Sequence, residues 1–388
     1  MTAVPYSFDE QHTAVVVSAR RIPTARAGGV YKDIRAHDLV APLLRAVVAD
    51  MPFPSESVAD VILGNATGGG GNIARLAALT AGLPVSVPGM SVDRQCGSGL
   101  EAVVLACRLV GAGAGDVYLA GGVESISTAP TRAYRNSDGS LDFYERAQFA
   151  PLATGDPDAG VAAENVASYF GISREAQDAY ALDSHRRAVA AAAQGRFEQE
   201  LLPLAGISAD TGPRAHLTGK LMSRFPSVFV PGGTVTAGNS CPYSDGAALV
   251  VVTSLASARA RGLSGLVFVD SAVAGNDPNL LGVGASASTQ LLTHRLNREL
   301  NAGLLEYNEA FAAQVLATAQ ILGWDPHQFN LDGGALALGH PYGASGAVSI
   351  TRLFAQAHER AEQGLDALAM ISMAGGMGIS ALFRWRQA

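Results

Sequence analysis

One pattern occurs twice in this chain, and it limits the available folds more than any other feature. Residues 97–103 (GSGLEAV) match residues 344–350 (ASGAVSI). A helical stretch follows each copy, and then an apolar strand that ends in two glycines, at 121–122 and 375–376. We therefore predict a duplicated α/β unit with one functional site where the two halves meet.

Apolar strands alternate with Ala- and Leu-rich helical stretches on both sides of the middle of the chain. A helix is predicted at 34–48, and a loop leading into a helix at 304–323. The predicted strands are 14–19, 58–66, 116–122 and 266–275, with a pair of strands around a Gly turn within 366–383. This alternation is typical of α/β proteins, so we predict a mostly parallel sheet covered on both faces.

The length of 388 residues predicts two or three domains. Residues 126–245 contain more charge, proline and turns than either half. We predict that 1–125 with 246–265 form the N-terminal half, that 266–388 form the C-terminal half, and that 126–245 are an inserted lid. The stretch 175–200 within it predicts an exposed helix with a glycine stop; a plain helical decoration explains the composition of this region as well as a lid does.

The composition excludes several classes of protein. The net charge is −7 and no run of Lys and Arg stands out, so we expect no nucleic-acid surface. No apolar run reaches the roughly 18 residues of a membrane span. Three cysteines argue against a disulfide framework, and residues 1–13 lack the features of a secretion signal. We expect a cytoplasmic protein.

Cys96 precedes an apolar helical stripe that includes Leu100, Val103 and Cys107. A thiol at the start of a helix lies near free N–H groups and the positive end of the helix dipole, which favour the nucleophilic thiolate. An isolated cysteine is more often a packing residue, and we expect that role for Cys107. The Gly-Ser-Gly loop after Cys96 favours a nucleophile instead.

Two further side chains are candidates for catalysis. His340 lies among glycines and before a proline, so we expect a rigid turn to present it as a base for the thiol proton. A structural histidine that caps a turn is the alternative. Asn308 precedes a predicted helix, where it suits either an N-cap or an oxyanion hole that holds a water molecule.

Other motifs are absent. The glycines at 68–71 do not complete a dinucleotide fingerprint, and the chain has neither a G-K-[ST] phosphate loop nor a G-x-S-x-G elbow. The eight histidines do not cluster with cysteines or carboxylates at metal spacing, so we expect no metal.

Taken together, several segments resemble the thiolase family, in the family's order and over nearly the whole chain. They are RQCGSGLEAV at 94–103, AGGVESIS at 120–127, AAENVASYFGISREAQDAYALDSH at 162–185, TVTAGN at 234–239, DGAA at 245–248, NEAFA at 308–312 and GGALALGHPYGASG at 333–346. The resemblance implies a five-layered αβαβα fold built from two similar halves, with an inserted lid.

The resemblance also implies a mechanism. Cys96 takes an acyl group from coenzyme A, His340 activates it, and His340 and a water on Asn308 polarise the second thioester. The N–H groups of Cys96 and Ala374 form a second oxyanion hole. No cofactor is bound permanently, acyl-CoA is the substrate of a ping-pong Claisen-type reaction of lipid metabolism, and dimers or tetramers are expected.

Four departures from the family pattern involve five positions. Ser372 stands where the family has a second, acid/base cysteine, and Ala374 where it has a glycine. Asp158 and Ala159 replace a His-Met pair of the acyl pocket, and Cys241 replaces a serine of the coenzyme loop. That loop includes Ala237 and Gly238, and Arg224 just before it is a candidate phosphate contact.

These departures keep three functions open. The first is a C-acyltransferase, which the missing second cysteine would specialise for condensation. The second is a thioester hydrolase, in which water intercepts acyl-Cys96. The third is a non-catalytic acyl-CoA binding protein, against which the presence of Cys96, Asn308 and His340 argues.

Overall fold

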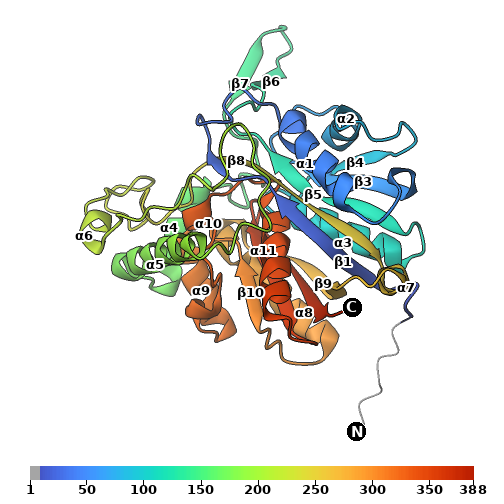
Figure 1. Cartoon of the computed structure of the whole chain (residues 1–388). Helices are drawn as coiled ribbons and strands as arrows, with labels where there is room; N and C mark the ends of the chain where they lie inside the picture. The colour runs from blue at the N-terminus through green and yellow to red at the C-terminus, as the bar shows by residue number, and fades with distance from the viewer. Residues whose placement is uncertain (1–8) are drawn as a thin grey trace.

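The computed structural model describes residues 9–388 (Figure 1). Residues 1–8, which belong to the segment without secretion-signal features, lie outside this range. The N-terminal half contains β1 (Ala14–Arg21), β2 (Ala25–Arg26), α1 (Ala36–Asp50), β3 (Val58–Gly64), α2 (Ile73–Thr80), β4 (Gly89–Val92), α3 (Ser98–Gly111), β5 (Val117–Glu124) and β8 (Ser244–Ser254). A short helix, α7 (Leu255–Ala260), leads to the second half.

The C-terminal half has a similar order of elements. It contains β9 (Gly265–Gly275), α8 (Gly284–Leu296), β10 (Leu304–Tyr307), α9 (Ala312–Leu322), α10 (Ala335–Leu338), α11 (Ser345–Arg360), β11 (Asp366–Met373) and β12 (Met377–Arg386). Short 3-10 helices lie at Ser55–Ser57, Pro278–Val283 and Pro326–Gln328. The residues at 304–307, predicted as a loop, are therefore a buried strand.

The main strands form one hydrogen-bonded sheet in the order β10-β11-β12-β9-β1-β8-β5-β3-β4. Within the sheet of residues 9–388, the two halves are joined by the pairing of β1 with β9, through the register pairs Val15 with Val267 and Val16 with Leu266. The prediction of a mostly parallel sheet is wrong. Only β3–β4, β3–β5 and β10–β11 run parallel, while β1, β8, β9 and β12 pair antiparallel with their neighbours.

The physical reason is that burial does not reveal strand direction. All residues of β8 are buried, as are most of β12, so both read as the continuous apolar runs that are typical of parallel strands. Yet each is the last strand of its half and returns beside the first one. In the C-terminal half the return is a tight turn in which Gly375 and Gly376 have φ of +80° and +75°, a conformation that favours glycine.

The five layers expected from the resemblance are present. A central core lies between the two half-sheets and contains α3 and α11, including Val103, Cys107 and Leu353. A second core places α1 and α2 on the outer face of the N-terminal half. A third places α8 and α9 on the outer face of the C-terminal half (Figure 1).

The repeated Gly-containing motif is explained by the contact between the two central helices. A Cβ on Gly99 would lie 2.7 Å from the carbonyl oxygen of Gly343, and one on Gly346 would lie 2.4 Å from the backbone nitrogen of Leu100. Neither position has room for a side chain. The starts of α3 and α11 therefore pack backbone to backbone, and this brings residues near 96 and near 340 together.

One strand of the repeat is missing from the second copy. In the N-terminal half β4 pairs parallel with β3, and α3 follows. At the equivalent place the C-terminal half has only an isolated parallel bridge between Leu305 and Phe329. The segment after Phe329 is irregular apart from α10, and it carries His340.

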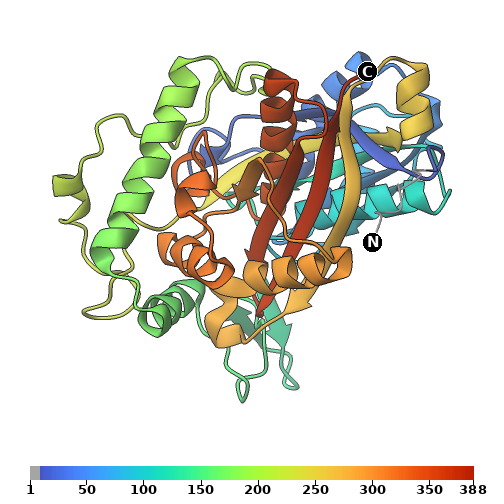
Figure 2. The ribbon, with the colours of Figure 1, turned by 90° about the horizontal axis from the view of Figure 1, so that it is seen from below.

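The segment between β5 and β8 leaves the sheet. It contains β6 (Arg132–Arg135), β7 (Leu141–Tyr144), α4 (Ala159–Phe170), α5 (Arg174–Ala193) and α6 (Gly219–Met222). The β6–β7 hairpin projects from the body in Figure 1, and α5 runs along one side of the molecule in Figure 2. The prediction of an exposed helix here is only half right, because α5 buries polar residues such as Gln177 and Ser184. Within residues 9–388, no helix is long and apolar enough to cross a membrane.

Candidate active site

Cys96 lies immediately before the N-cap residue of α3, Gly97. The turn that holds it is tight: Gln95 has a φ of +50°, and the Ser98 hydroxyl donates to the Gln95 carbonyl at 2.6 Å while accepting from the Arg94 N–H at 2.8 Å. A Cβ on Gly97 would lie 2.2 Å from the Met373 sulfur. The nucleophile candidate is thus fixed against the end of β11.

The charge state of Cys96 differs from the expectation. The thiol is half-buried, and burial raises its pKa to about 12, against the opposing effect of hydrogen bonds from the N–H groups of Ala374 and of Cys96 itself. The prediction of a thiolate is therefore wrong for the resting protein, because desolvation outweighs the helix terminus. The two N–H groups that reach the sulfur are those expected to form an oxyanion hole.

His340 is buried rather than presented at the surface. Its Nδ1 lies 2.6 Å from the Ser345 hydroxyl, which donates to the Pro341 carbonyl at 2.9 Å. Since that hydroxyl's proton is committed, we assign the tautomer with the proton on Nδ1, which leaves Nε2 as an acceptor. Burial lowers the pKa of His340 to about 3, so the imidazole is neutral.

Asn308 faces the free side of this imidazole, with its amide nitrogen 3.4 Å from His340 Nε2. The N-cap alternative is wrong, because α9 begins at Ala312 and its N-cap residue is Phe311. The next residue, Glu309, is a buried carboxylate that accepts hydrogen bonds from Tyr180 at 2.9 Å and Ser184 at 2.7 Å on α5. The Asn308 loop is therefore anchored to the inserted segment.

Glu124 was not singled out from the sequence, although it lies within the segment AGGVESIS. Its buried carboxylate accepts hydrogen bonds from Asn65, from Ala66 and Thr67, and from the N–H of Gly343 at 2.9 Å. Burial raises the pKa of Glu124 while these donors oppose the rise. Glu124 thus ties the His340 turn to the N-terminal half.

Ser372 is held by neighbours that are not bases. Its hydroxyl oxygen accepts the Ala285 N–H at 2.9 Å and lies 3.0 Å from the Tyr307 hydroxyl. The Tyr307 hydroxyl in turn donates to the Gly282 carbonyl at 3.0 Å. The proton of Ser372 therefore points to a phenol that is already committed to a carbonyl.

The coenzyme-loop residues adjoin these groups. Cys241 donates its N–H to the carbonyl of Ala310, two residues after Asn308, at 2.9 Å. Tyr243 forms an isolated β-bridge with His340 through the backbone. Ala237 is exposed, and a Cβ on Gly238 would lie 2.8 Å from the ring of Phe225. Arg224, the neighbour of Phe225, is exposed beside this loop.

Asp158 and Ala159 lie where α4 begins. Asp158 is the N-cap residue, but its carboxylate makes an ion pair with Arg146 at 2.7 Å instead of capping the helix. Gly160, which follows Ala159, lies against the ring of Phe229. That ring packs edge-on against Phe311, with ring centroids 6.0 Å apart. These residues therefore adjoin the Asn308 loop from the side of the inserted segment.

Two more features belong to the surroundings of the site. The ring of Tyr342 packs edge-on against His340 with centroids 5.0 Å apart, and negative charge on Cys241 or Cys96 would raise the pKa of its phenol further than burial already does. Sequence analysis missed Tyr342 and Ser345 because both lie inside a motif that was interpreted through its histidine.

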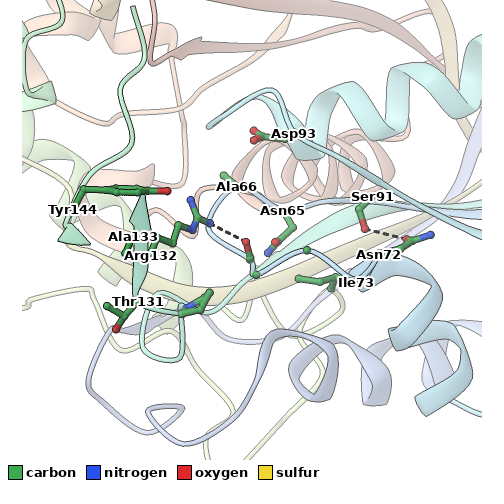
Figure 3. A pocket seen from close by; sticks show the side chains of 14 residues that line it. Asn65, Ala66, Asn72, Ile73, Ser91, Asp93, Thr131, Arg132, Ala133 and Tyr144 are labelled. Carbon is green, nitrogen blue, oxygen red and sulfur yellow. Dashed lines mark hydrogen bonds between the residues drawn. The ribbon is translucent and has the colours of Figure 1, made fainter. Parts of the chain in front are cut away.

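A cavity lies away from these residues, between the loop at 68–70 and the β6–β7 hairpin (Figure 3). Its volume is about 730 Å³, and its lining includes Asn65, Ser91, Asp93, Arg132 and Tyr144. None of the predicted site residues lines it. Within residues 9–388, no group of three or more His, Cys, Asp or Glu side chains is placed to hold a metal ion.

Comparison with known proteins agrees with this arrangement. Residues 14–256 match the family model "Thiolase, N-terminal domain", and 265–385 match "Thiolase, C-terminal domain". A Staphylococcus aureus protein, "Putative acetyl-CoA C-acetyltransferase VraB", is 43% identical over 95% of this chain and 98% of its own. A Bacillus subtilis protein, "Putative acetyl-CoA C-acetyltransferase YhfS", is 45% identical over the same shares.

The fold comparison extends this likeness to a solved structure. The crystal structure of the Bacillus anthracis acetyl-CoA acetyltransferase has a TM-score of 0.91 and 32% sequence identity, and the match covers 97% of this chain and 99% of that one. With both halves matched in order and the site residues gathered where the halves meet, this chain belongs to the thiolase family of acyltransferases.

Proposed function

We propose that this protein is a thiolase-type C-acyltransferase that acts on acyl-CoA thioesters through an acyl-enzyme on Cys96. The observation that carries the proposal is the pairing of two groups at one place: a cysteine whose sulfur receives two backbone N–H groups, and a buried histidine with a free Nε2 beside an asparagine amide. The names of the relatives agree with this activity.

The resting charges indicate how the reaction starts. Cys96 and His340 are both neutral, so the proton leaves the thiol as the sulfur attacks the thioester carbonyl, with His340 Nε2 as acceptor. The N–H groups of Cys96 and Ala374 then stabilise the oxyanion of the tetrahedral intermediate. In the second half of the ping-pong cycle, Asn308, with a bound water, and His340 polarise the thioester of the second acyl-CoA.

We further propose a specialised condensing enzyme in which Ser372 replaces the acid/base cysteine of the family. A serine needs a partner base to move a proton at neutral pH, and Ser372 contacts an amide and a phenol instead. A second substrate that is already activated, for example by decarboxylation, would not need this base.

The coenzyme site is assigned to the inserted segment. Ala237, Gly238 and Cys241 would contact the pantetheine arm, Arg224 the phosphates, and Asp158 and Ala159 the region of the acyl pocket. Their support is the packing of Phe225 on Gly238 and of Phe229 on Gly160. Coenzyme A is a substrate here and is not retained between turnovers.

A homodimer or homotetramer is proposed from the exposed edge of the sheet. Among the described strands β4 pairs only with β3, and free strand edges are sites of association. The projecting hairpin beside it exposes Tyr134, Leu141 and Phe143. We also retain the proposed division into two halves and an insertion, and a cytoplasmic location.

The deciding experiment is intact-mass analysis after incubation with a panel of acyl-CoAs, followed by peptide mapping. We expect one acyl adduct, on Cys96, and none in Cys96→Ser. Release of free acid without a second thioester would favour the hydrolase alternative. Binding without any adduct at any chain length would favour the non-catalytic alternative, and an adduct on Cys241 or Cys107 would contradict the assignment.

A further inference from the structure

A second, small cavity lies beside Asn308 and Ser345, two residues whose side chains contact His340. Its volume is about 20 Å³, and its lining includes Glu306, Asn308, Ser345, Ser349 and Arg352. A cavity of roughly 10–15 Å³ or more holds one water molecule if polar groups surround it. This cavity meets both conditions.

Unsatisfied polar atoms surround the same place. Arg352 is 1% exposed, and its Nε finds no acceptor on the protein within residues 9–388. Gln356, one helical turn further along α11, has a buried Oε1 without a donor in that range. Buried polar groups nearly always bind protein or ordered water, so a water in the cavity would be held by Arg352 and by the serine hydroxyls.

The chemistry of His340 makes this cavity important. A proton taken from Cys96 would leave an imidazolium in a fully buried place, and burial is opposed by no carboxylate at His340 among residues 9–388. Its Nδ1 lies 2.6 Å from the Ser345 hydroxyl. Ser345 also lines the cavity, and so does the carboxylate residue Glu306.

We propose that a buried water in this cavity connects His340, through Ser345, to Glu306, and that Glu306 stores the proton that Cys96 loses. The thiol proton passes to His340 Nε2, and the Nδ1 proton passes to the Ser345 oxygen. The Ser345 hydroxyl turns from the Pro341 carbonyl and gives its proton to the water, which gives one to the Glu306 carboxylate. The result is a Cys96 thiolate, a neutral His340 and a protonated Glu306.

The surroundings of Glu306 suit a group that exchanges protons near neutral pH. Burial raises its pKa to about 8; the charge of Arg352 on α11 lowers it, and those of Asp332 and Glu309 raise it. Gln356 donates to its Oε1 at 2.9 Å. Above the pKa Glu306 is a carboxylate and can accept the proton, and below it Glu306 is already protonated and cannot.

The test measures thiolate formation directly and needs no acyl-CoA. The rate of Cys96 alkylation by iodoacetamide is followed against pH in the full-length protein, with peptide mapping to exclude Cys107 and Cys241. We expect the native rate to rise through about pH 8 and then level off. In Glu306→Gln the levelling near pH 8 should disappear, and the rate at pH 8.5 should fall by about tenfold or more, as for other residues that act through a catalytic partner.

Two variants on α11 separate the relay from a structural effect. Ser349→Val fills the cavity and keeps Glu306, so we expect the same loss as in Glu306→Gln. Thr351→Val changes a buried residue whose hydroxyl only bonds to the Ala347 carbonyl at 2.9 Å, so we expect the native profile. If Glu306→Gln fails to fold, Ser349→Val carries the test.

Three results would overturn the proposal: a native profile without a change near pH 8, an unaltered profile in Glu306→Gln, or an unaltered profile in Ser349→Val. The proposal rests on Cys96 as the nucleophile of the proposed function but fails separately from it. A protein that forms Cys96 adducts from acyl-CoA but shows an unaltered alkylation profile in Glu306→Gln would keep the function and lose the relay.

Discussion

At the scale of single residues, the charge states of Cys96 and His340 decide how the site works. Both groups are neutral at rest, since burial raises the pKa of the thiol to about 12 and lowers that of the imidazole to about 3. The sulfur becomes a strong nucleophile once its proton has left.

Ser372→Cys is the substitution that tests the condensing role. Ala285 lies in the first turn of α8, so its N–H and the helix terminus would stabilise a thiolate at position 372. We expect carbon–carbon bond cleavage or formation to increase by more than an order of magnitude, in line with the roughly 10²–10⁴-fold of general acid–base catalysis. Acylation of Cys96 should not change, as intact-mass kinetics would show.

Tyr307→Phe is the matched control for this change. It removes the phenol that receives the Ser372 proton but adds no acid/base group, so carbon–carbon chemistry should not increase. A native protein that already matches ordinary thiolases in both directions would contradict the account of Ser372.

At the scale of elements, the sequence was informative about motifs and weak about geometry. Cys96, His340 and Asn308 come from local patterns, and the structure gathers them in one place. The start of α9, the strand at 304–307 and the antiparallel return of β8 were missed, whereas the pair of strands around a Gly turn within 366–383 is confirmed as β11 and β12. The direction of β8 depends on β1 and β5, which lie more than a hundred residues away in the chain. The strand at 304–307 likewise forms against a later segment, β11. The burial that raises the pKa of Cys96 and lowers that of His340 also comes from segments distant in the chain.

Arg224→Ala tests the coenzyme loop as an element. Arg224 follows α6 and is exposed beside the loop, so its removal should weaken coenzyme A binding several-fold at low salt, and less as salt screens the charge. Calorimetric titration at several salt concentrations measures this. Arg186→Ala, an exposed arginine on α5, should leave the affinity unchanged. An Arg224→Ala protein with native affinity at every salt concentration would remove Arg224 from the coenzyme site.

At the scale of the whole molecule, a buried ionic network joins all three parts of the chain. Arg21 on β1 pairs with Glu200 at 2.7 Å and with Asp210 at 2.6 Å, both from the inserted segment. Glu200 also pairs with Arg352 on α11, and the ring of Phe197 lies under both arginines. Buried ion pairs therefore connect the inserted segment to both halves.

Removing one charge from this network should destabilise the whole fold. In Glu200→Gln two arginines lose their shared carboxylate, and breaking a buried pair costs about 3–5 kcal/mol. Denaturant unfolding monitored by circular dichroism measures the loss. Asp50→Asn, which breaks the more exposed pair with Arg20, should cost about 0–1 kcal/mol. Equal effects of the two variants would show that the network contributes no more than a surface pair.

The strand that the second half lacks has a consequence for what a duplicated protein can become. Two identical copies would contain two equivalent active sites. The first copy has an edge strand, β4, which leads directly to Cys96. The second copy has only a single bridge at Phe329 in that place, and the residues that follow form the turn that carries His340. In the proposed reaction one copy would supply the attacking atom and the other the group that takes its proton. The duplicated architecture would then contain a single site, with one covalently bound acyl group per chain.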